Sequence, residues 1–135
     1  MLYKKMLLIF SLASVLSGCG NALNRIKEAE WVSIPYAIDK GLSDSCSTLS
    51  FVTKENQYSL VNCVTRIGMN DTYIIVASAK NAKDSTRYWI INKSIQELGK
   101  VEKKENVEGP LDSQQFSSRK KDLNIVNIAF TKDIN

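Results

Sequence analysis

The sequence has 135 residues, with 18 Lys and Arg against 14 Asp and Glu, and a formal net charge of +4. It contains no histidine, which excludes Ser-His-Asp and Cys-His catalytic sets and removes the commonest side-chain ligand of metals. The length suits one small domain with its own core, and the small positive excess predicts no nucleic-acid partner. We therefore expect no enzyme activity and no cofactor.

The first 18 residues have the layout of a secretory signal peptide. Lys4 and Lys5 precede a mostly apolar run over residues 6–16. A run of this length is typical of a signal core, whereas a membrane-spanning helix needs about 20 apolar residues. We predict a signal peptide over 1–18; the alternatives are an uncleaved membrane anchor and a buried helix.

The end of this segment is more specific than an ordinary signal. Leu16-Ser17-Gly18-Cys19 resembles the lipobox of bacterial lipoproteins. The resemblance implies that Cys19 becomes the mature N-terminus and carries a diacylglycerol, usually with a further acyl chain. Two or more chains hold a protein stably on a membrane. Gly20 stands where an Asp favours inner-membrane retention, which implies the outer membrane, facing the periplasm, in a cell with two membranes.

The mature chain divides into a tether and one folded domain. Residues 19–30 are mostly polar and are interpreted as a tether, with the domain over residues 31–135. Residues 31–38 alternate apolar and other side chains, which predicts a strand. Pro35 cannot donate to a strand ladder and so predicts a position at a sheet edge.

A hairpin and a disulfide are predicted next along the chain. Residues 48–53 and 58–67 read as its two strands, in a register that sets Thr48 opposite Cys63. This register and an oxidising compartment both favour a disulfide between Cys46 and Cys63. The alternative is two buried free thiols.

The middle of the chain contains the strongest strand signals. Residues 72–79 are almost wholly apolar and predict a central strand buried on both faces. Residues 87–93 predict the next strand, with Tyr88 and Trp89 on opposite sides. Residues 100–108 carry charges of both signs and predict a solvated loop.

The last third predicts a break, a helix and a final extended segment. Gly109-Pro110 breaks the chain, and Asp112 or Ser113 can cap a helix that ends near Leu123. Residues 125–131 predict a last strand or an extended tail packed on the body. The sum is an α+β fold, a mostly antiparallel sheet of five or six strands with one C-terminal helix.

A hydrophobic pattern from about residue 60 to residue 123 resembles a family of small uncharacterised bacterial lipoproteins. It consists of Tyr73-Ile74-Ile75, the run from Tyr88 to Lys93, Gly109-Pro110-Leu111 and Phe116. The resemblance implies the same architecture and supplies no activity.

Three aromatic residues are candidates for a ligand-binding groove, namely Trp31, Tyr88 and Trp89. Aromatic residues on strands more often belong to the core, which is the competing interpretation. Asp44, Asp71 and Asp84 each stand alone in predicted turns, and Cys46 and Cys63 lack histidine partners, so we expect no metal site.

The predicted helix carries two further candidates. Ser117 and Lys120 match the spacing of a Ser-x-x-Lys catalytic pair, but the companion motifs of penicillin-recognising enzymes are absent, which favours a solvated helix face. Arg119-Lys120-Lys121 could contact anionic lipid or an acidic partner, or could simply complement the helix dipole.

These observations favour a lipid-anchored, non-catalytic envelope protein that binds a protein partner, with an immunity or inhibitor protein as one form. The alternatives are a small-ligand-binding lipoprotein and a structural envelope component.

Overall fold

The computed structural model describes residues 30–40 and 46–134. The predicted signal peptide, Cys19, the tether up to residue 29 and Asp44 lie outside these residues. Within them the chain forms nine strands and two short helices. In chain order the elements are β1 (Glu30–Ser33), β2 (Tyr36–Asp39), β3 (Thr48–Val52), β4 (Gln57–Val61), β5 (Val64–Met69), β6 (Tyr73–Ser78), β7 (Arg87–Asn92), α3 (Leu98–Glu102), β8 (Val107–Leu111), α4 (Ser113–Asp122) and β9 (Lys132–Asp133).

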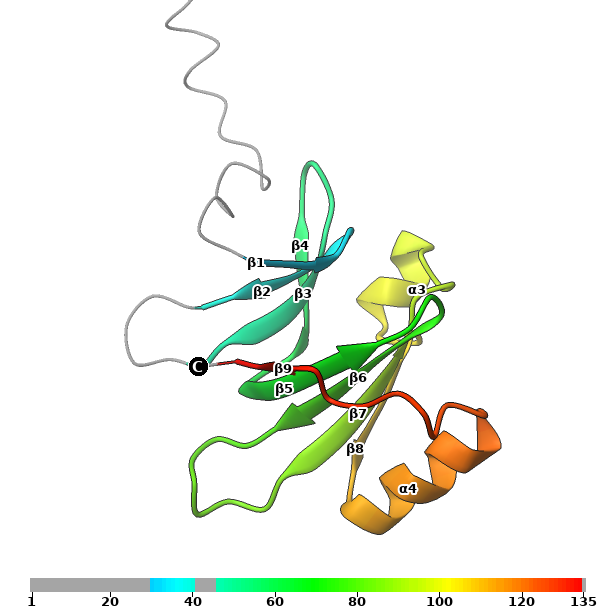
Figure 1. The fold of residues 1–135 in the computed structure, drawn as a ribbon. Helices are drawn as coiled ribbons and strands as arrows, with labels where there is room; N and C mark the ends of the chain where they lie inside the picture. Colours follow the sequence, from blue (N-terminus) through cyan, green and yellow to red (C-terminus); the bar gives the residue numbers. More distant parts are fainter. Residues whose placement is uncertain (1–29, 41–45, 135) are drawn as a thin grey trace, which may run out of the picture.

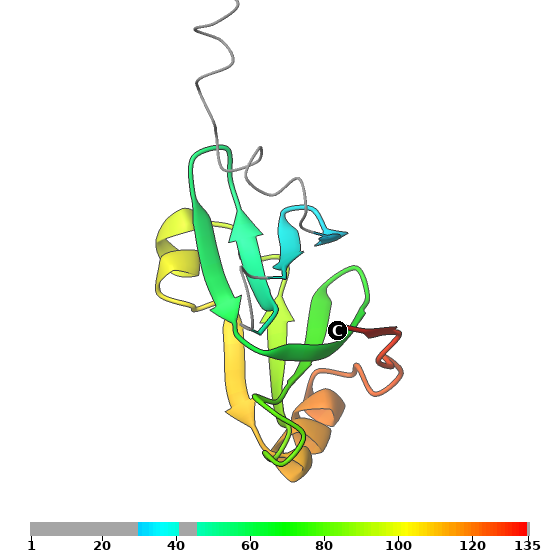
Figure 2. The same ribbon diagram turned by 90° about the vertical axis from the view of Figure 1, so that its left-hand side faces the viewer.

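The strands form two antiparallel sheets that pack face to face. The first sheet has the order β1-β2-β3-β4 and the second the order β8-β7-β6-β5-β9. Helix α4 lies beyond the second sheet, so the molecule has three layers (Figures 1 and 2). The predicted antiparallel pairing and C-terminal helix are confirmed. The prediction of a single sheet in an α+β fold is corrected to a predominantly β fold with two sheets.

The chain passes from one sheet to the other at Cys63. The segment 58–67, predicted as one strand, divides there into β4 and β5. Cys63 has a φ of 56°, in the left-handed region that few non-glycine residues adopt, and the chain turns at this point. The alternating pattern continues across the turn, which is why the sequence predicted an unbroken strand.

The first predicted strand is also divided, at Pro35. Strands β1 and β2 form a hairpin in which Trp31 pairs with Ala37, and the proline lies in the connecting turn rather than in an edge strand. Proline has no N–H to donate to a ladder, so a turn accommodates it without loss of a hydrogen bond.

The hairpin of β3 and β4 is confirmed, but its register differs from the prediction by two residues. Phe51 pairs with Tyr58. Thr53 lies in the loop instead, where its N–H donates to the carbonyl of Asn56 over 2.8 Å. Thr48 therefore lies beside Asn62, to which its hydroxyl donates over 3.3 Å, and not opposite Cys63.

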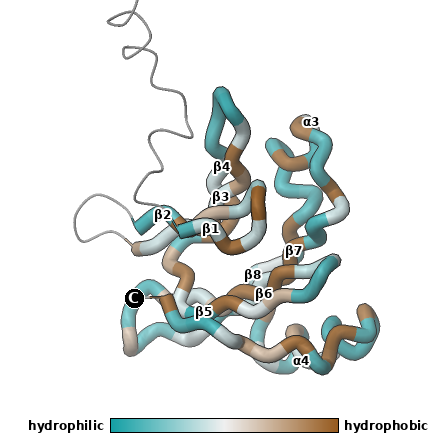
Figure 3. The backbone as a smooth tube through the Cα atoms, turned by 45° about the horizontal axis from the view of Figure 1, so that its top comes forward, coloured by the Kyte–Doolittle hydropathy of each residue, from teal (hydrophilic) through white to brown (hydrophobic). Residues whose placement is uncertain are grey.

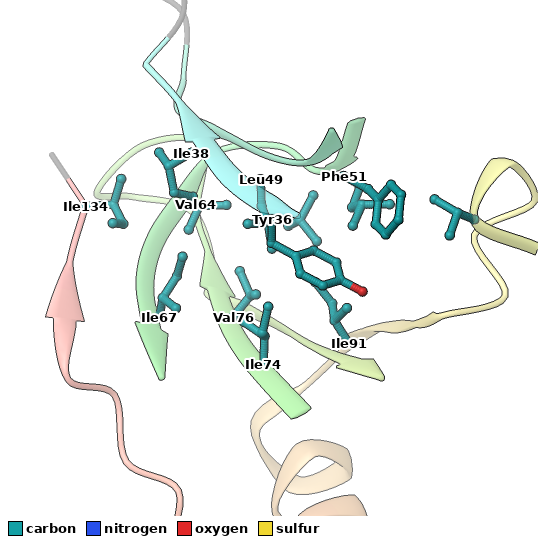
Figure 4. Packing of buried hydrophobic residues seen from close by; sticks show 13 residues of the cluster. Tyr36, Ile38, Leu49, Phe51, Val64, Ile67, Ile74, Val76, Ile91 and Ile134 are labelled. Carbon is teal, nitrogen blue, oxygen red and sulfur yellow. The ribbon is translucent and has the colours of Figure 1, made fainter. Parts of the chain in front are cut away.

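The main core lies between the two sheets (Figure 4). Strand β6 is central, as predicted: Ile74 and Val76 face the first sheet, and Ile75 faces the opposite side. Each fully buried side chain of this size contributes roughly 1.5–3 kcal/mol. The core residues are Tyr36, Ile38, Leu49, Phe51, Leu60, Val61, Val64, Ile67, Ile74, Val76, Ile91, Val101 and Ile134.

A second apolar cluster joins α4 and the chain after it to the outer face of the second sheet. Phe116 of α4 packs there with Ile125 and Ile128 against strands β6 and β7. The segment 125–131 forms no strand and instead packs on the body as an irregular tail. It approaches β5 at Gly68, where a Cβ atom would collide with the carbonyl oxygen of Ala129.

Two further predictions in this region were wrong. Gly109-Pro110 does not break the chain but lies inside β8, at the edge of the second sheet, opposite a shift in register along β7. Edges and bulges are where proline is tolerated in sheets. The predicted solvated loop over 100–108 contains most of helix α3, which buries Val101 in the main core.

No helix in the described ranges is long and apolar enough to cross a lipid bilayer.

Candidate functional site

Three turns enclose a hollow of about 240 Å³ at one end of the molecule, which we call the end hollow. They are the β1–β2 turn, the β5–β6 turn and the loop that follows β7. Figure 3 shows that the β1–β2 turn is hydrophobic. The hollow is lined by Ser33, Ile34, Tyr36, Asp71, Thr72, Lys93, Ser94 and Gln96.

Local hydrogen bonds hold these turns in place. The Asn70 side-chain oxygen accepts from the backbone N–H groups of Thr72 at 2.9 Å and Tyr73 at 2.7 Å. The N–H of Lys93 donates to the carbonyl of Thr72 over 2.8 Å. Such side-chain to backbone bonds define a turn and rigidify it. Hydrogen bonds therefore hold two of the three turns that line the end hollow, the β5–β6 turn and the start of the loop after β7.

The end hollow combines polar side chains with one strongly exposed apolar side chain. Ile34, on the β1–β2 turn, is 79% exposed. Lys93 donates from Nζ to the Ser33 hydroxyl over 3.4 Å and so links the turns of the two sheets. Small-molecule sites usually enclose about 300–1,000 Å³. The end hollow is smaller than this range.

Two polar side chains, Tyr36 of the end hollow and Asn106 of the loop before β8, are buried near each other. Tyr36 has no exposed surface, and Asn106 is almost as completely buried. Neither the Tyr36 hydroxyl nor the Asn106 amide makes a well-formed hydrogen bond to the described part of the protein. Burial raises the pKa of Tyr36, and the nearby Asn106 side chain opposes that rise in part. The two side chains are therefore close, although their geometry falls short of a hydrogen bond.

The three predicted groove aromatics are not brought together. Tyr88 and Trp89 lie on opposite faces of β7, and Trp31 lies on β1 of the other sheet. Tyr88 stacks on Phe116 with ring centroids 4.5 Å apart. Trp89 donates from Nε1 to the Ser78 hydroxyl over 2.8 Å. Tyr88 and Trp89 thus pack in the core, as the competing interpretation predicted. Of the three residues, Trp31 has the large exposed fraction, 39%.

Arg119 and Lys120 hold helix α4 on the body of the protein. Arg119 donates from Nε to both carboxylate oxygens of Glu108 at 2.9 Å, and this hydrogen bond is the main reason that its pKa is raised. Lys120 donates from Nζ to the carbonyl of Ile128 over 2.8 Å. Lys120 is thus engaged with backbone, and Ser117 is exposed on the helix surface.

The disulfide between Cys46 and Cys63 is present, with an S–S distance of 2.06 Å and Cα atoms 4.4 Å apart. It lies where the chain leaves the first sheet for the second. In the ranges 30–40 and 46–134 no three Cys, Asp or Glu side chains gather as a metal site would require. Asp71 and Asp84 occupy separate turns.

These features define a small, disulfide-linked protein of two packed β-sheets with a shallow hollow at one end. A family model described as a protein of unknown function (DUF3997) matches residues 44–135, which are 92 of the 135 residues. The chain belongs to this DUF3997 family, in agreement with its resemblance to an uncharacterised family. No curated protein and no solved structure matches the chain.

The two buried polar side chains were missed by the sequence analysis. Tyr36 belongs to an alternating apolar run, and Asn106 belongs to the charged segment that was predicted to be a solvated loop. The charged surroundings of Asn106 give no signal of its burial. The one available signal was the even spacing of Tyr36 with Ile34 and Ile38, which placed it on an apolar face.

Proposed function

We propose that this protein is a lipid-anchored, non-catalytic binding protein of the bacterial cell envelope. Cys19 carries the lipid, and the β domain holds a protein partner at the membrane surface, facing the periplasm if the cell has an outer membrane. Immunity against a delivered toxin, or inhibition of an envelope enzyme, is one form of this function. The observation that carries the proposal is the run Leu16-Ser17-Gly18-Cys19 ahead of a disulfide-closed domain.

The chemistry of the end hollow supports binding over turnover. The chain has no histidine, and the lysine in the hollow, Lys93, already donates to a serine hydroxyl. The exposed Ile34 at the rim offers an apolar contact beside polar groups. Interfaces with proteins commonly combine an apolar anchor with a polar rim. The small volume of the hollow favours a partner's side chain over a whole small ligand.

The anchor is tested by the mass of the mature protein extracted from membranes. We expect an N-terminus at Cys19 with a mass increase that corresponds to diacylglycerol, with or without a third acyl chain. The Cys19→Ala protein should lose this mass and leave the membrane fraction. A water-soluble mature protein that begins elsewhere would contradict the proposal.

The partner surface is tested with a photo-reactive residue in place of Ile34 in cells of the native host. Irradiation should yield one discrete protein adduct. Val126, which is 59% exposed on the segment after α4, provides a matched apolar control position. Adducts of equal yield at both positions, or none at Ile34, would refute the end hollow as the partner site.

A further inference from the structure

Trp31 is a large aromatic side chain that the fold leaves partly uncovered. Strand β1 alternates, with Val32 packed against the main core and Trp31 on the opposite, outer face of the first sheet. There Trp31 pairs with Ala37, which pairs with Ser50, which in turn pairs with Ser59. This row carries no charge, and Trp31 is its exposed apolar member, since Ala37 and Ser50 are buried.

The place of Trp31 in the chain sets it close to the lipid. Eleven residues, 20–30, separate Cys19 from Trp31. Even a fully extended chain of this length spans at most about 40 Å. The outer face of the first sheet is also the layer farthest from α4 (Figures 1 and 2). The exposed tryptophan therefore lies on the first described element after the predicted anchor.

We infer that the outer face of the first sheet docks on the membrane surface through Trp31. This inference rests on the lipid anchor of the proposed function and deepens it, since it orients the domain. Tryptophan is enriched at membrane–water interfaces, where its ring sits at the level of the headgroups. A short linker raises the effective concentration of a second contact to the millimolar range, so weak docking suffices.

The nearest carboxylate on this face is that of Asp39, which follows Ala37 by two residues and accepts from the Gln57 side-chain amide over 3.5 Å. Glu30, beside Trp31 in β1, forms an ion pair with Lys132 of β9, so their charges cancel. The basic residues Arg119 and Lys120 lie on α4 at the other side of the molecule. Docking in this orientation directs α4 into the aqueous compartment and leaves the end hollow at the side of the domain.

The test uses the two tryptophans of the chain, Trp31 and Trp89. The full lipidated protein is reconstituted into phosphatidylcholine and phosphatidylglycerol vesicles with or without brominated acyl chains, which quench nearby tryptophan. In the Trp89→Phe protein the emission comes from Trp31, and we expect brominated lipid to remove most of it. In the Trp31→Phe protein the emission comes from the inward-facing Trp89, and we expect no loss.

Flotation of the same vesicles separates the docking from the anchor. A protein that floats with the vesicles while Trp31 stays unquenched overturns the docking and leaves the anchor intact. The docking is also overturned if brominated lipid does not quench Trp31 but its emission changes with the surface density of protein. That result would indicate that a second copy of the protein covers this face. A wild-type protein that fails to float overturns the anchor and the docking together. The Cys19→Ala protein should show neither flotation nor quenching.

Discussion

At the scale of single residues, Gly109 occupies a position that only glycine tolerates. Its φ is 143°, outside the range of ordinary side-chain-bearing residues, and a Cβ atom would lie 2.6 Å from the Trp89 ring and 2.8 Å from the Tyr88 carbonyl oxygen. The close approach lets the edge strand β8 bulge across β7. The glycine of the family-like Gly-Pro-Leu pattern is therefore explained by packing.

We predict that Gly109→Ala lowers the free energy of unfolding by about 1–3 kcal/mol, because the residue would adopt a disfavoured conformation against a fixed ring. Gly99 in helix α3 is the matched control, since nothing lies within 4 Å of its added Cβ. Gly99→Ala should be neutral or stabilise by up to about 1 kcal/mol. Urea unfolding measures both, and equal stability of the two variants would contradict the argument.

Tyr36 is the residue whose burial should appear in the pH dependence of stability. Burial raises its pKa in the folded protein above the ordinary value of about 10. Above that pH the unfolded chain loses the phenolic proton while the folded protein keeps it. The free energy of unfolding must then fall as pH rises towards the folded pKa.

We predict that Tyr36→Phe removes this alkaline loss. Near pH 8 the variant should differ from wild type by about 1 kcal/mol or less, since the hydroxyl has no well-formed hydrogen bond to lose. Above about pH 10 the variant should lose stability less steeply than wild type. Urea unfolding at a series of pH values checks this, and parallel curves for the two proteins would disprove it.

At the scale of elements, α4 depends on its first turn. The Asp112 carboxylate accepts from the N–H of Gln115 over 2.8 Å, and the Gln115 side chain accepts from the N–H of Asp112 over 2.9 Å. This reciprocal pair is a capping box, which satisfies two backbone donors at once. It sets where α4 begins and so places Phe116 over the second sheet.

We predict that Asp112→Ala destabilises the protein by about 0.5–2 kcal/mol through loss of the cap. Asp112→Asn keeps the side-chain acceptor and should retain most of the stability. Chemical denaturation followed by circular dichroism distinguishes the variants. If the asparagine variant loses as much as the alanine variant, the carboxylate charge and not the hydrogen bond accounts for the effect.

At the scale of the whole molecule, the disulfide stabilises the crossing between the two sheets. Cys46 precedes β3 of the first sheet, Cys63 precedes β5 of the second, and the bridge spans 17 residues. Closure of a loop of this size stabilises the folded state by about 3 kcal/mol in the chain-entropy model.

We predict that Cys46→Ala, Cys63→Ala and the double variant each lose about 2–4 kcal/mol of stability. The three losses should be alike, because either single substitution already removes the bridge. Urea midpoints under oxidising conditions measure the effect, with reduced wild type as the comparison. Two free thiols found by peptide mapping of the native protein would refute the pairing itself.

The features that the sequence determined are those set by near neighbours. The central strand β6 followed from an apolar run, and the opposite faces of Tyr88 and Trp89 followed from alternation along β7. The start of α4 followed from Asp112, and the disulfide from two cysteines near the predicted hairpin. In each case the deciding interactions lie within one element or between elements adjacent in the chain.

The tertiary structure decided everything that depends on distant pairing. Only the packing of two sheets showed that the chain crosses from one sheet to the other at Cys63. The pairing of β8 with β7 placed Gly109-Pro110 in an edge strand. The packing of three separate turns formed the end hollow. The physical reason is that alternation specifies which face of a strand is buried, whereas the partner of each strand depends on residues far away in the chain.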